Sequence, residues 1–331
     1  MRKEALYWQP LEEGKVKCLL CPRECVVRPG KRGYCRVRLN HGGKLYADGY
    51  GQTISLAMDP IEKKPLYHFY PGSYILSLGP NGCNLSCVFC QNWQVSQTNV
   101  PTRYVSPEKL VDLAIHHQSV GIAFTYSEPL IWFEYILDVA KVGRPKGLKI
   151  VLVTNGIINP EPLEDLLPWV DAMNVDLKSM RNEFYRELCR GPFKDTVLHT
   201  IERGHKAGIH VEVTNLIIPG YNDSQTDIQE LIDWIAAVSP RVPLHFSRFF
   251  PHYQLRDVPP TPIETLAMAR EMALKKLEYV YVGNVWNREW DTTYCPKCGE
   301  ALIVREGYTT PIINLKDNSC PRCGEYIPVI L

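Results

Sequence analysis

The stretch that decides the fold is residues 74–92, YILSLGPNGCNLSCVFCQN. Its first part, residues 74–78, is an apolar run that predicts a buried strand ending at a Gly-Pro pair. Three cysteines follow on a Gly-rich loop, with three residues between Cys83 and Cys87 and two between Cys87 and Cys90. Because α/β sheets and barrels carry their chemistry at the carboxyl ends of strands, this loop is the predicted functional site.

Three thiolates on one short loop can hold one side of an iron–sulfur cluster. A cluster of four irons needs four ligands, and ferredoxins supply four cysteines. This loop has no fourth cysteine, so one iron is left for an external ligand, as catalytic zinc sites keep an open position. The alternative from the residues alone is a zinc knuckle that takes a fourth ligand from elsewhere in the chain.

Apolar strand segments alternate with helical segments up to about residue 283. Besides 74–78, the expected strands are 122–126, 149–153, 172–177, 210–218, 244–249 and 279–282, and the expected helices are 106–118, 130–142, 160–168, 182–189, 197–207, 224–237 and 261–277. Repeated strand–helix units imply parallel strands with right-handed crossovers. We therefore predict an α/β fold, an open partial (β/α)6 TIM-like barrel or a doubly wound sheet, over residues 51–284.

The composition excludes several classes of protein. A net charge of +1 argues against a general nucleic-acid coat. No run approaches the roughly 18–20 apolar residues of a membrane helix, and the N-terminus lacks an apolar signal core, so we expect a cytoplasmic protein with no membrane contact. Twelve cysteines in a chain long enough to build its own core indicate metal sites rather than disulfides.

The three-cysteine loop resembles the CxxxCxΦC signature of the radical S-adenosylmethionine (SAM) superfamily, which Cys83, Cys87, Phe89 and Cys90 satisfy. The resemblance runs from residue 74 to about residue 250 and is closest to the branch of pyruvate formate-lyase activating enzymes. The N-terminal CLLCPRECVVRPGKRGYC stretch and the C-terminal CPKCG and CPRCG motifs resemble proteins of the AmmeMemoRadiSam system.

The resemblance implies a [4Fe–4S] cluster whose unique iron is chelated by the amino and carboxylate groups of SAM. One electron from the cluster cleaves the sulfonium C–S bond, giving methionine and a 5′-deoxyadenosyl radical that abstracts hydrogen from a substrate. The cofactor carries this chemistry, while the protein binds, orients and excludes water. The family also implies an external electron donor of the flavodoxin or ferredoxin type, and it suggests association with Memo-like and AMMECR-like proteins.

The same resemblance implies SAM contacts at the strand ends. The cofactor-binding residues that it implies are Phe89, Tyr126, Ser127, Glu128, Thr154, Asn155, Asp176, Lys178, Asn215 and His245. In this set Glu128 matches a Gly-Gly-Glu-Pro-like motif in which Tyr126 and Ser127 replace the glycines, and Lys178 is expected to pair with the SAM carboxylate as a point charge. The alternatives are purely structural roles. Glu128 is then a carboxylate in the first turn of a helix, and Thr154 and Asn155 form a strand-to-helix turn. Asp176 and Lys178 then lie at a solvated strand end, and His245 is a core histidine with its hydrogen bonds satisfied.

Two CPxCG motifs supply a second cysteine group in residues 285–331. Each motif puts two thiols on a tight turn, and four thiolates close a tetrahedron around one metal ion. Cys295, Cys298, Cys320 and Cys323 therefore predict a zinc ribbon, with a rubredoxin-like iron site as the alternative.

A third cysteine group lies in residues 1–50, a Gly-punctuated, basic segment that needs a metal or a host domain for its stability. Cys18, Cys21, Cys25 and Cys35 fit a four-thiolate site. Zinc is the preferred metal here, and a second iron–sulfur cluster is also compatible. The lysines and arginines of this segment leave a contact with nucleic acid open.

We therefore predict a radical SAM oxidoreductase of the glycyl-radical-activating type. Its hydrogen donor is a glycine in a partner protein, an RNA base or a small metabolite, and the sequence does not choose among them. The alternatives are radical SAM modification of RNA or a metabolite, and a non-catalytic zinc or electron-transfer protein. Cys189 stands alone and is expected to be a buried small residue. The HxE pair at residues 210–212 lies in a predicted strand without a PCxxC motif, so a zinc deaminase is rejected.

Overall fold

The computed structural model describes residues 2–331. Its core is one nine-stranded sheet with the strand order β15-β14-β13-β12-β11-β10-β8-β7-β9. The parallel strands are β8 (Tyr74–Pro80), β10 (Gly121–Phe124), β11 (Lys149–Thr154), β12 (Ala172–Asp176), β13 (His210–Ile217), β14 (Leu244–Arg248) and β15 (Val280–Gly283). Two antiparallel strands, β7 (Gln52–Pro60) and β9 (Arg103–Tyr104), form one edge. The edge strands β15 and β9 do not pair with each other, so the sheet is open.

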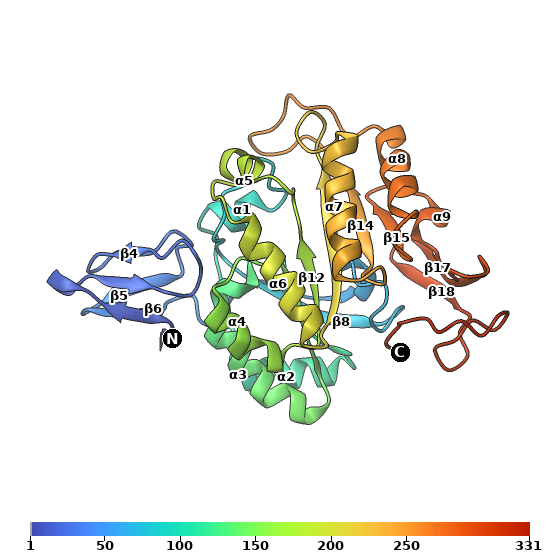
Figure 1. Ribbon diagram of the computed structural model, residues 1–331. Coiled ribbons are helices and arrows are strands. Elements are labelled where there is room, and N and C mark those ends of the chain that lie inside the picture. Colours follow the sequence, from blue (N-terminus) through green and yellow to red (C-terminus); the bar gives the residue numbers. More distant parts are fainter. Residues whose placement is uncertain (1) are drawn as a thin grey trace.

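Helices follow the parallel strands and cover one face of the sheet (Figure 1). They are α1 (Trp93–Gln97), α2 (Pro107–His116), α3 (Phe133–Gly143), α4 (Pro160–Leu166), α5 (Asn182–Leu188), α6 (Lys194–Lys206), α7 (Gln225–Val238), α8 (Ile263–Ala273) and α9 (Arg288–Asp291). The short 3-10 helices are η1 (Glu12–Gly14), η2 (Ile61–Lys63), η3 (Pro129–Trp132), η4 (Arg144–Lys146) and η5 (Leu167–Trp169). Ser106 and Ser224 cap α2 and α7, since each hydroxyl accepts a backbone N–H of the first turn. The predicted α/β fold with a parallel sheet is confirmed.

The opposite face of the sheet is covered by the 61–70 segment. Ile61, Leu66 and Phe69 pack against apolar residues of four neighbouring strands, β8, β10, β11 and β12. The backbone N–H groups of Tyr67 and His68 donate to the buried carboxylate of Glu212 on β13, at 3.0 and 2.8 Å. Both faces of the sheet are thus covered, as parallel sheets require.

The N-terminal region forms two small antiparallel sheets, β2-β3-β4 and β1-β6-β5, beside the core (Figure 1). Their strands are β1 (Lys3–Glu4), β2 (Trp8–Pro10), β3 (Val16–Cys18), β4 (Val26–Val27), β5 (Arg38–His41) and β6 (Lys44–Ala47). A buried ion pair of 2.7 Å between Arg38 and Glu134 joins this region to α3. Strands of two to four residues are too short to give a periodic sequence signal.

The C-terminal region forms the sheet β16-β17-β18 on the opposite side of the core (Figure 1). Its strands are β16 (Thr293–Tyr294), β17 (Ala301–Glu306) and β18 (Thr309–Ile313). Buried Arg305 donates to the backbone carbonyl of Tyr67 at 2.5 Å, and Ile330 forms a parallel bridge with Phe69. The C-terminal region is therefore attached to the 61–70 segment. The division of the chain at residues 50 and 284 stays a prediction. No helix within residues 2–331 is long and apolar enough to cross a membrane.

A glycine at the end of β8 tests the close packing beneath the cysteine loop. A Cβ on Gly79 would lie 2.1 Å from the Thr125 carbonyl oxygen, so we expect Gly79→Ala to lower the free energy of unfolding by about 3 kcal/mol. The control is Gly283→Ala at the end of β15, where the added Cβ meets only Ser247 Oγ at 4.0 Å. Equal melting temperatures for the two variants in thermal unfolding would contradict this packing.

Candidate active site

The cysteine loop follows β8 and is held in place by backbone hydrogen bonds. The N–H groups of Ser86 and Val88 donate to the carbonyls of Cys189 and Leu188, at 3.2 and 2.8 Å, where α5 ends. The carbonyl of Val88 accepts the N–H of Gln254 at 2.9 Å. These contacts hold the loop against the end of α5 and against Gln254 through main-chain atoms.

Polar hydrogens are directed at the sulfur atoms of the loop. The N–H of Leu85 and the side-chain amide of Asn155 donate to Cys83 Sγ, at 3.3 and 3.8 Å. Ser96 Oγ lies 3.2 Å from Cys90 Sγ. Hydrogen bonds to cysteine sulfur are one of the means by which proteins tune iron–sulfur clusters. The donor set therefore fits such a cluster.

Cys87 lies between a second thiol and a buried ammonium. A side-chain hydrogen bond with Cys189, together with burial, raises the pKa of the Cys87 thiol well above its usual value. The charge of Lys178 acts in the opposite direction and lowers the pKa of both Cys87 and Cys90. Lys178 Nζ also donates to Asp176 at 2.9 Å. Asp176 and Lys178, which the sequence analysis expected to contact SAM, thus form an ion pair next to the cysteine loop.

The cysteine groups differ in the distances between their sulfur atoms. In the C-terminal group all four sulfurs lie within 4.8 Å of one another, with pairs at 3.5 and 3.6 Å. Across residues 2–331, no other set of three or more cysteines is gathered this closely. Zn–S bonds of about 2.3 Å place the thiolates of a tetrahedral site roughly 3.8 Å apart. The C-terminal group matches a single ion, whereas the sulfurs of Cys83, Cys87 and Cys90 do not all lie within 4.8 Å of one another, which disfavours the zinc knuckle.

Glu128 is a buried acid whose carboxylate has three donors. It accepts Thr154 Oγ1 at 2.6 Å, the Asn155 N–H at 2.8 Å and the Leu130 N–H at 2.9 Å. Burial raises the pKa of Glu128 to about 7, although these hydrogen bonds act to lower it. The carboxylate joins the end of β10 to the end of β11 and caps η3. Whether Glu128 and Thr154 also contact SAM stays a prediction.

Tyr126 replaces a motif glycine but keeps a glycine-like backbone, with a φ of +69°. Its hydroxyl donates to Asp59 Oδ2 at 2.7 Å, and buried Lys64 donates to the same oxygen at 2.6 Å. Ser127 Oγ donates to the Pro80 carbonyl at 2.6 Å. The two substitutions therefore add links from the motif to β7 and β8.

Asn215 uses its side-chain amide within the protein. The Nδ2 group donates to the carbonyls of Leu177 and Lys178, at 2.8 and 3.2 Å. Asn222 donates to the same Lys178 carbonyl at 2.8 Å. Both asparagines thus hold the segment that carries the Lys178 ammonium, and a nucleoside contact by Asn215 stays a prediction.

His245 lies in a buried cluster on β13 and β14. Its Nε2 is 2.6 Å from Glu212, which also pairs with His210 Nε2 at 2.8 Å. The rings of Tyr67 and Tyr281 pack against the imidazole. Burial acts to raise the pKa of Glu212, but hydrogen bonds from His210 and His245 hold it well below its usual range. The HxE pair is thus joined by an internal hydrogen bond, and a SAM contact by His245 stays a prediction.

The sequence analysis did not predict one residue of the site, Asn84, or one contact, that of Cys189 with Cys87. Asn84 is buried, accepts the Asn155 side-chain amide at 2.7 Å and donates to the Ile157 carbonyl at 2.9 Å. The contact of Cys189 with Cys87 was also missed, since the only signal was the isolation of Cys189 in the sequence. The predicted Phe89 is buried beside Phe184, with Lys178 Nζ 6.0 Å from its ring centre.

The radical SAM superfamily model matches residues 78–235 of this chain. The uncharacterized protein MJ0808 of Methanocaldococcus jannaschii is 47% identical over 336 residues, which cover 99% of this chain and 100% of that protein. The chain belongs to the radical SAM superfamily. Members of this superfamily are enzymes, and membership implies a [4Fe–4S] cluster and SAM.

More distant radical SAM relatives share the fold. A GTP 3′,8-cyclase of Thermodesulfovibrio yellowstonii is 24% identical over 203 residues, 59% of this chain and 58% of that protein. The crystal structure of a radical SAM methyltransferase from Sphaerobacter thermophilus has a TM-score of 0.50 and 16% identity, covering 65% of this chain and 67% of that one. These relatives act in different reactions, so the superfamily alone does not name the substrate.

The link between the strand ends is tested by Glu128→Ala. Removing the carboxylate leaves three donors unpaired in a buried site, so we expect the free energy of unfolding to fall by about 3 kcal/mol or more. The matched control is Glu164→Ala, because Glu164 makes an exposed pair with Arg203 whose loss costs about 1 kcal/mol at most. Denaturant titration measures both variants, and a Glu128→Ala loss as small as that of the control would exclude a structural role.

The C-terminal cysteine group is tested by Cys298→Ala. We expect this variant to lose about one zinc ion per chain and to melt at a lower temperature, because four thiolates are needed to close the site. Iron content and the visible absorbance of the cluster should stay unchanged. Lys297→Ala in the same knuckle is the control and should keep its zinc. Unchanged metal content and melting in Cys298→Ala would remove the zinc assignment.

Proposed function

We propose that this chain cleaves SAM reductively at a [4Fe–4S] cluster held by Cys83, Cys87 and Cys90. The observation that carries the proposal is a loop with three thiols spaced too widely for one metal ion, placed after a strand of a parallel sheet in a radical SAM chain. When bound, the cluster supplies one electron to the sulfonium C–S bond of SAM, which yields methionine and a 5′-deoxyadenosyl radical that takes a hydrogen atom from the substrate.

The residues around the loop bind and orient rather than react. The ammonium of Lys178, held by Asp176, is the point charge that we assign to the SAM carboxylate. Glu128 accepts the Asn155 N–H and so links the strand ends, and the side-chain amide of Asn155 donates to the Cys83 sulfur. The 61–70 segment packs against the amino-terminal parts of these strands, away from the strand ends that carry the site.

For the hydrogen donor we propose a glycine of a partner protein, as in activating enzymes, with reduction by a ferredoxin- or flavodoxin-type donor. Memo-like and AMMECR-like proteins are the partners that the terminal cysteine motifs suggest. The alternative, RNA modification, was motivated by basic side chains of the N-terminal region. Lys15, Lys17 and Arg32 pair there with carboxylates of their own region, which weakens that alternative.

Anaerobic reconstitution with iron, sulfide, SAM and dithionite tests the chemistry, with 5′-deoxyadenosine as the measured product. We expect Cys87→Ala to abolish the product, because the cluster loses one of its three protein ligands. Glu164→Ala, on the exposed side of α4, is the control and should keep the wild-type rate. Full turnover by Cys87→Ala would contradict the proposal.

The substrate class needs a separate comparison. Addition of a glycine-containing partner protein should stimulate 5′-deoxyadenosine formation by the reconstituted enzyme, and copurified RNA should not. Stimulation by RNA alone would favour the RNA alternative. Absence of product from a protein that carries its full cluster would favour the non-catalytic electron-transfer alternative.

A further inference from the structure

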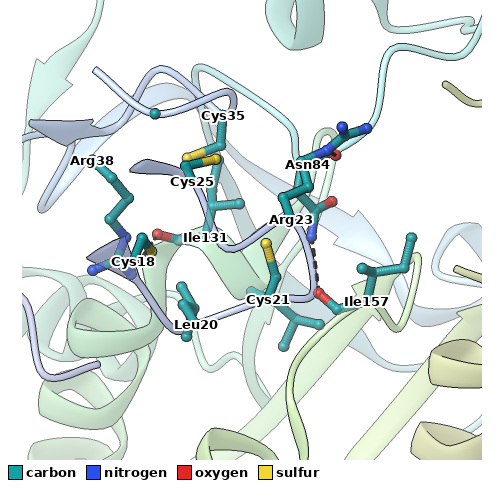
Figure 2. Close-up of a pocket in the computed structure, with 12 residues that line it drawn as sticks. Cys18, Leu20, Cys21, Arg23, Cys25, Cys35, Arg38, Asn84, Ile131 and Ile157 are labelled. Carbon is teal, nitrogen blue, oxygen red and sulfur yellow. Dashed lines mark hydrogen bonds between the residues drawn. The ribbon is translucent and has the colours of Figure 1, made fainter. Parts of the chain in front are cut away.

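The four cysteines of the N-terminal region border a single cavity (Figure 2). Cys18 and Cys21 lie on one loop, and Cys25 and Cys35, from two further segments, lie next to each other (Figure 2). The remaining wall is mostly apolar and includes leucine and isoleucine side chains. A cavity that four thiols share fits a group that binds sulfur ligands.

The cavity is small, and no three of the sulfurs that border it lie close together. Its volume is about 20 Å³, against the roughly 10–15 Å³ that one water molecule requires on the same measure. No three of the four sulfurs gather within 4.8 Å, although the C-terminal cysteines do so in the same chain. Sulfurs around one Zn²⁺ would lie roughly 3.8 Å apart. Neither the N-terminal thiols nor those of the Cys83 loop meet this spacing for a single ion.

A buried cation in the cavity wall lacks one hydrogen-bond partner. Arg38 is 2% exposed, and its two terminal nitrogens bind Glu134 at 2.7 Å and the Ile131 carbonyl at 3.0 Å. Its Nε has no partner. An unpaired buried donor costs about 1–3 kcal/mol, so an acceptor is expected in the cavity. The sulfides and thiolates of an iron–sulfur cluster are such acceptors.

A backbone N–H group contacts one of the four sulfurs. The N–H of Tyr34 donates to Cys25 Sγ at 3.4 Å. The cavity thus presents thiols and N–H donors together, which is the environment that iron–sulfur clusters use.

We propose that Cys18, Cys21, Cys25 and Cys35 hold a second [4Fe–4S] cluster. With four cysteine ligands this cluster has no open iron, so it does not bind SAM. The geometry favours it over zinc, the metal that the residue spacing alone had favoured.

The second site shares a wall with the cysteine loop of the active site. Asn84 lines the cavity, while its Oδ1 accepts the Asn155 amide that also reaches Cys83 Sγ at 3.8 Å. Gly82 lies against the Cys35 carbonyl so closely that a Cβ would be 2.3 Å from the oxygen. The two sets of thiols are therefore neighbours in the folded chain.

The test counts iron in variants that remove one site at a time. After anaerobic reconstitution we expect about eight irons per chain in the wild type and about four in Cys83→Ala/Cys87→Ala/Cys90→Ala. The reduced triple variant should give a [4Fe–4S]⁺ electron paramagnetic resonance spectrum that SAM does not change. Cys21→Ala/Cys25→Ala should also hold about four irons, with a spectrum that SAM does change.

A triple variant that folds but holds no iron, with about two zinc ions per chain, would overturn the second cluster. If the triple variant fails to fold, the comparison of wild type with Cys21→Ala/Cys25→Ala decides, because equal iron content in the two would also overturn it. These counts do not depend on SAM cleavage. Failure of the proposed function would instead appear as missing 5′-deoxyadenosine at an unchanged iron content.

Discussion

The cysteine loop is held by main-chain hydrogen bonds, and the rest of the site depends on that constraint. Ser86 and Val88 bond to the end of α5, and Gln254 bonds to the loop from the other side. Because main-chain hydrogen bonds hold the loop, they help to preorganise its three thiols for a cluster. The carboxylate of Glu128 then keeps the strand ends at a set separation and holds Asn155 within reach of the loop.

The three cysteine groups place the same type of side chain in different geometries. On the CPxCG turns the sulfurs pair at 3.5 and 3.6 Å, and nothing but a small ion fits between them. In the N-terminal region the four thiols border a cavity whose wall includes Arg38 and apolar side chains, and no three of their sulfurs lie within 4.8 Å of one another. Metal identity is thus decided by the distance that the fold imposes on the thiols, which residue spacing along the chain does not give.

Much of the core was predictable because buried parallel strands are continuous apolar runs. The strands at 74–78 and 210–218 were placed within two residues of β8 and β13. The 61–70 segment carried no periodic signal, and its role depends on long-range contacts such as those of Glu212. In the site, the cysteine spacing predicted the loop, but the contact of Cys189 with Cys87 arises from the docking of α5, which no local pattern encodes.

The contact between Gly82 and the Cys35 carbonyl restricts the sequence changes that the two segments meeting there can accept. Any side chain at position 82 would collide with the main chain of the N-terminal region, so the two segments are under a common steric selection. A chimera that joins the first fifty residues of one homologue to the sheet of another must transfer the matching loop as well. Recombination within this family is therefore expected to exchange both segments together or neither.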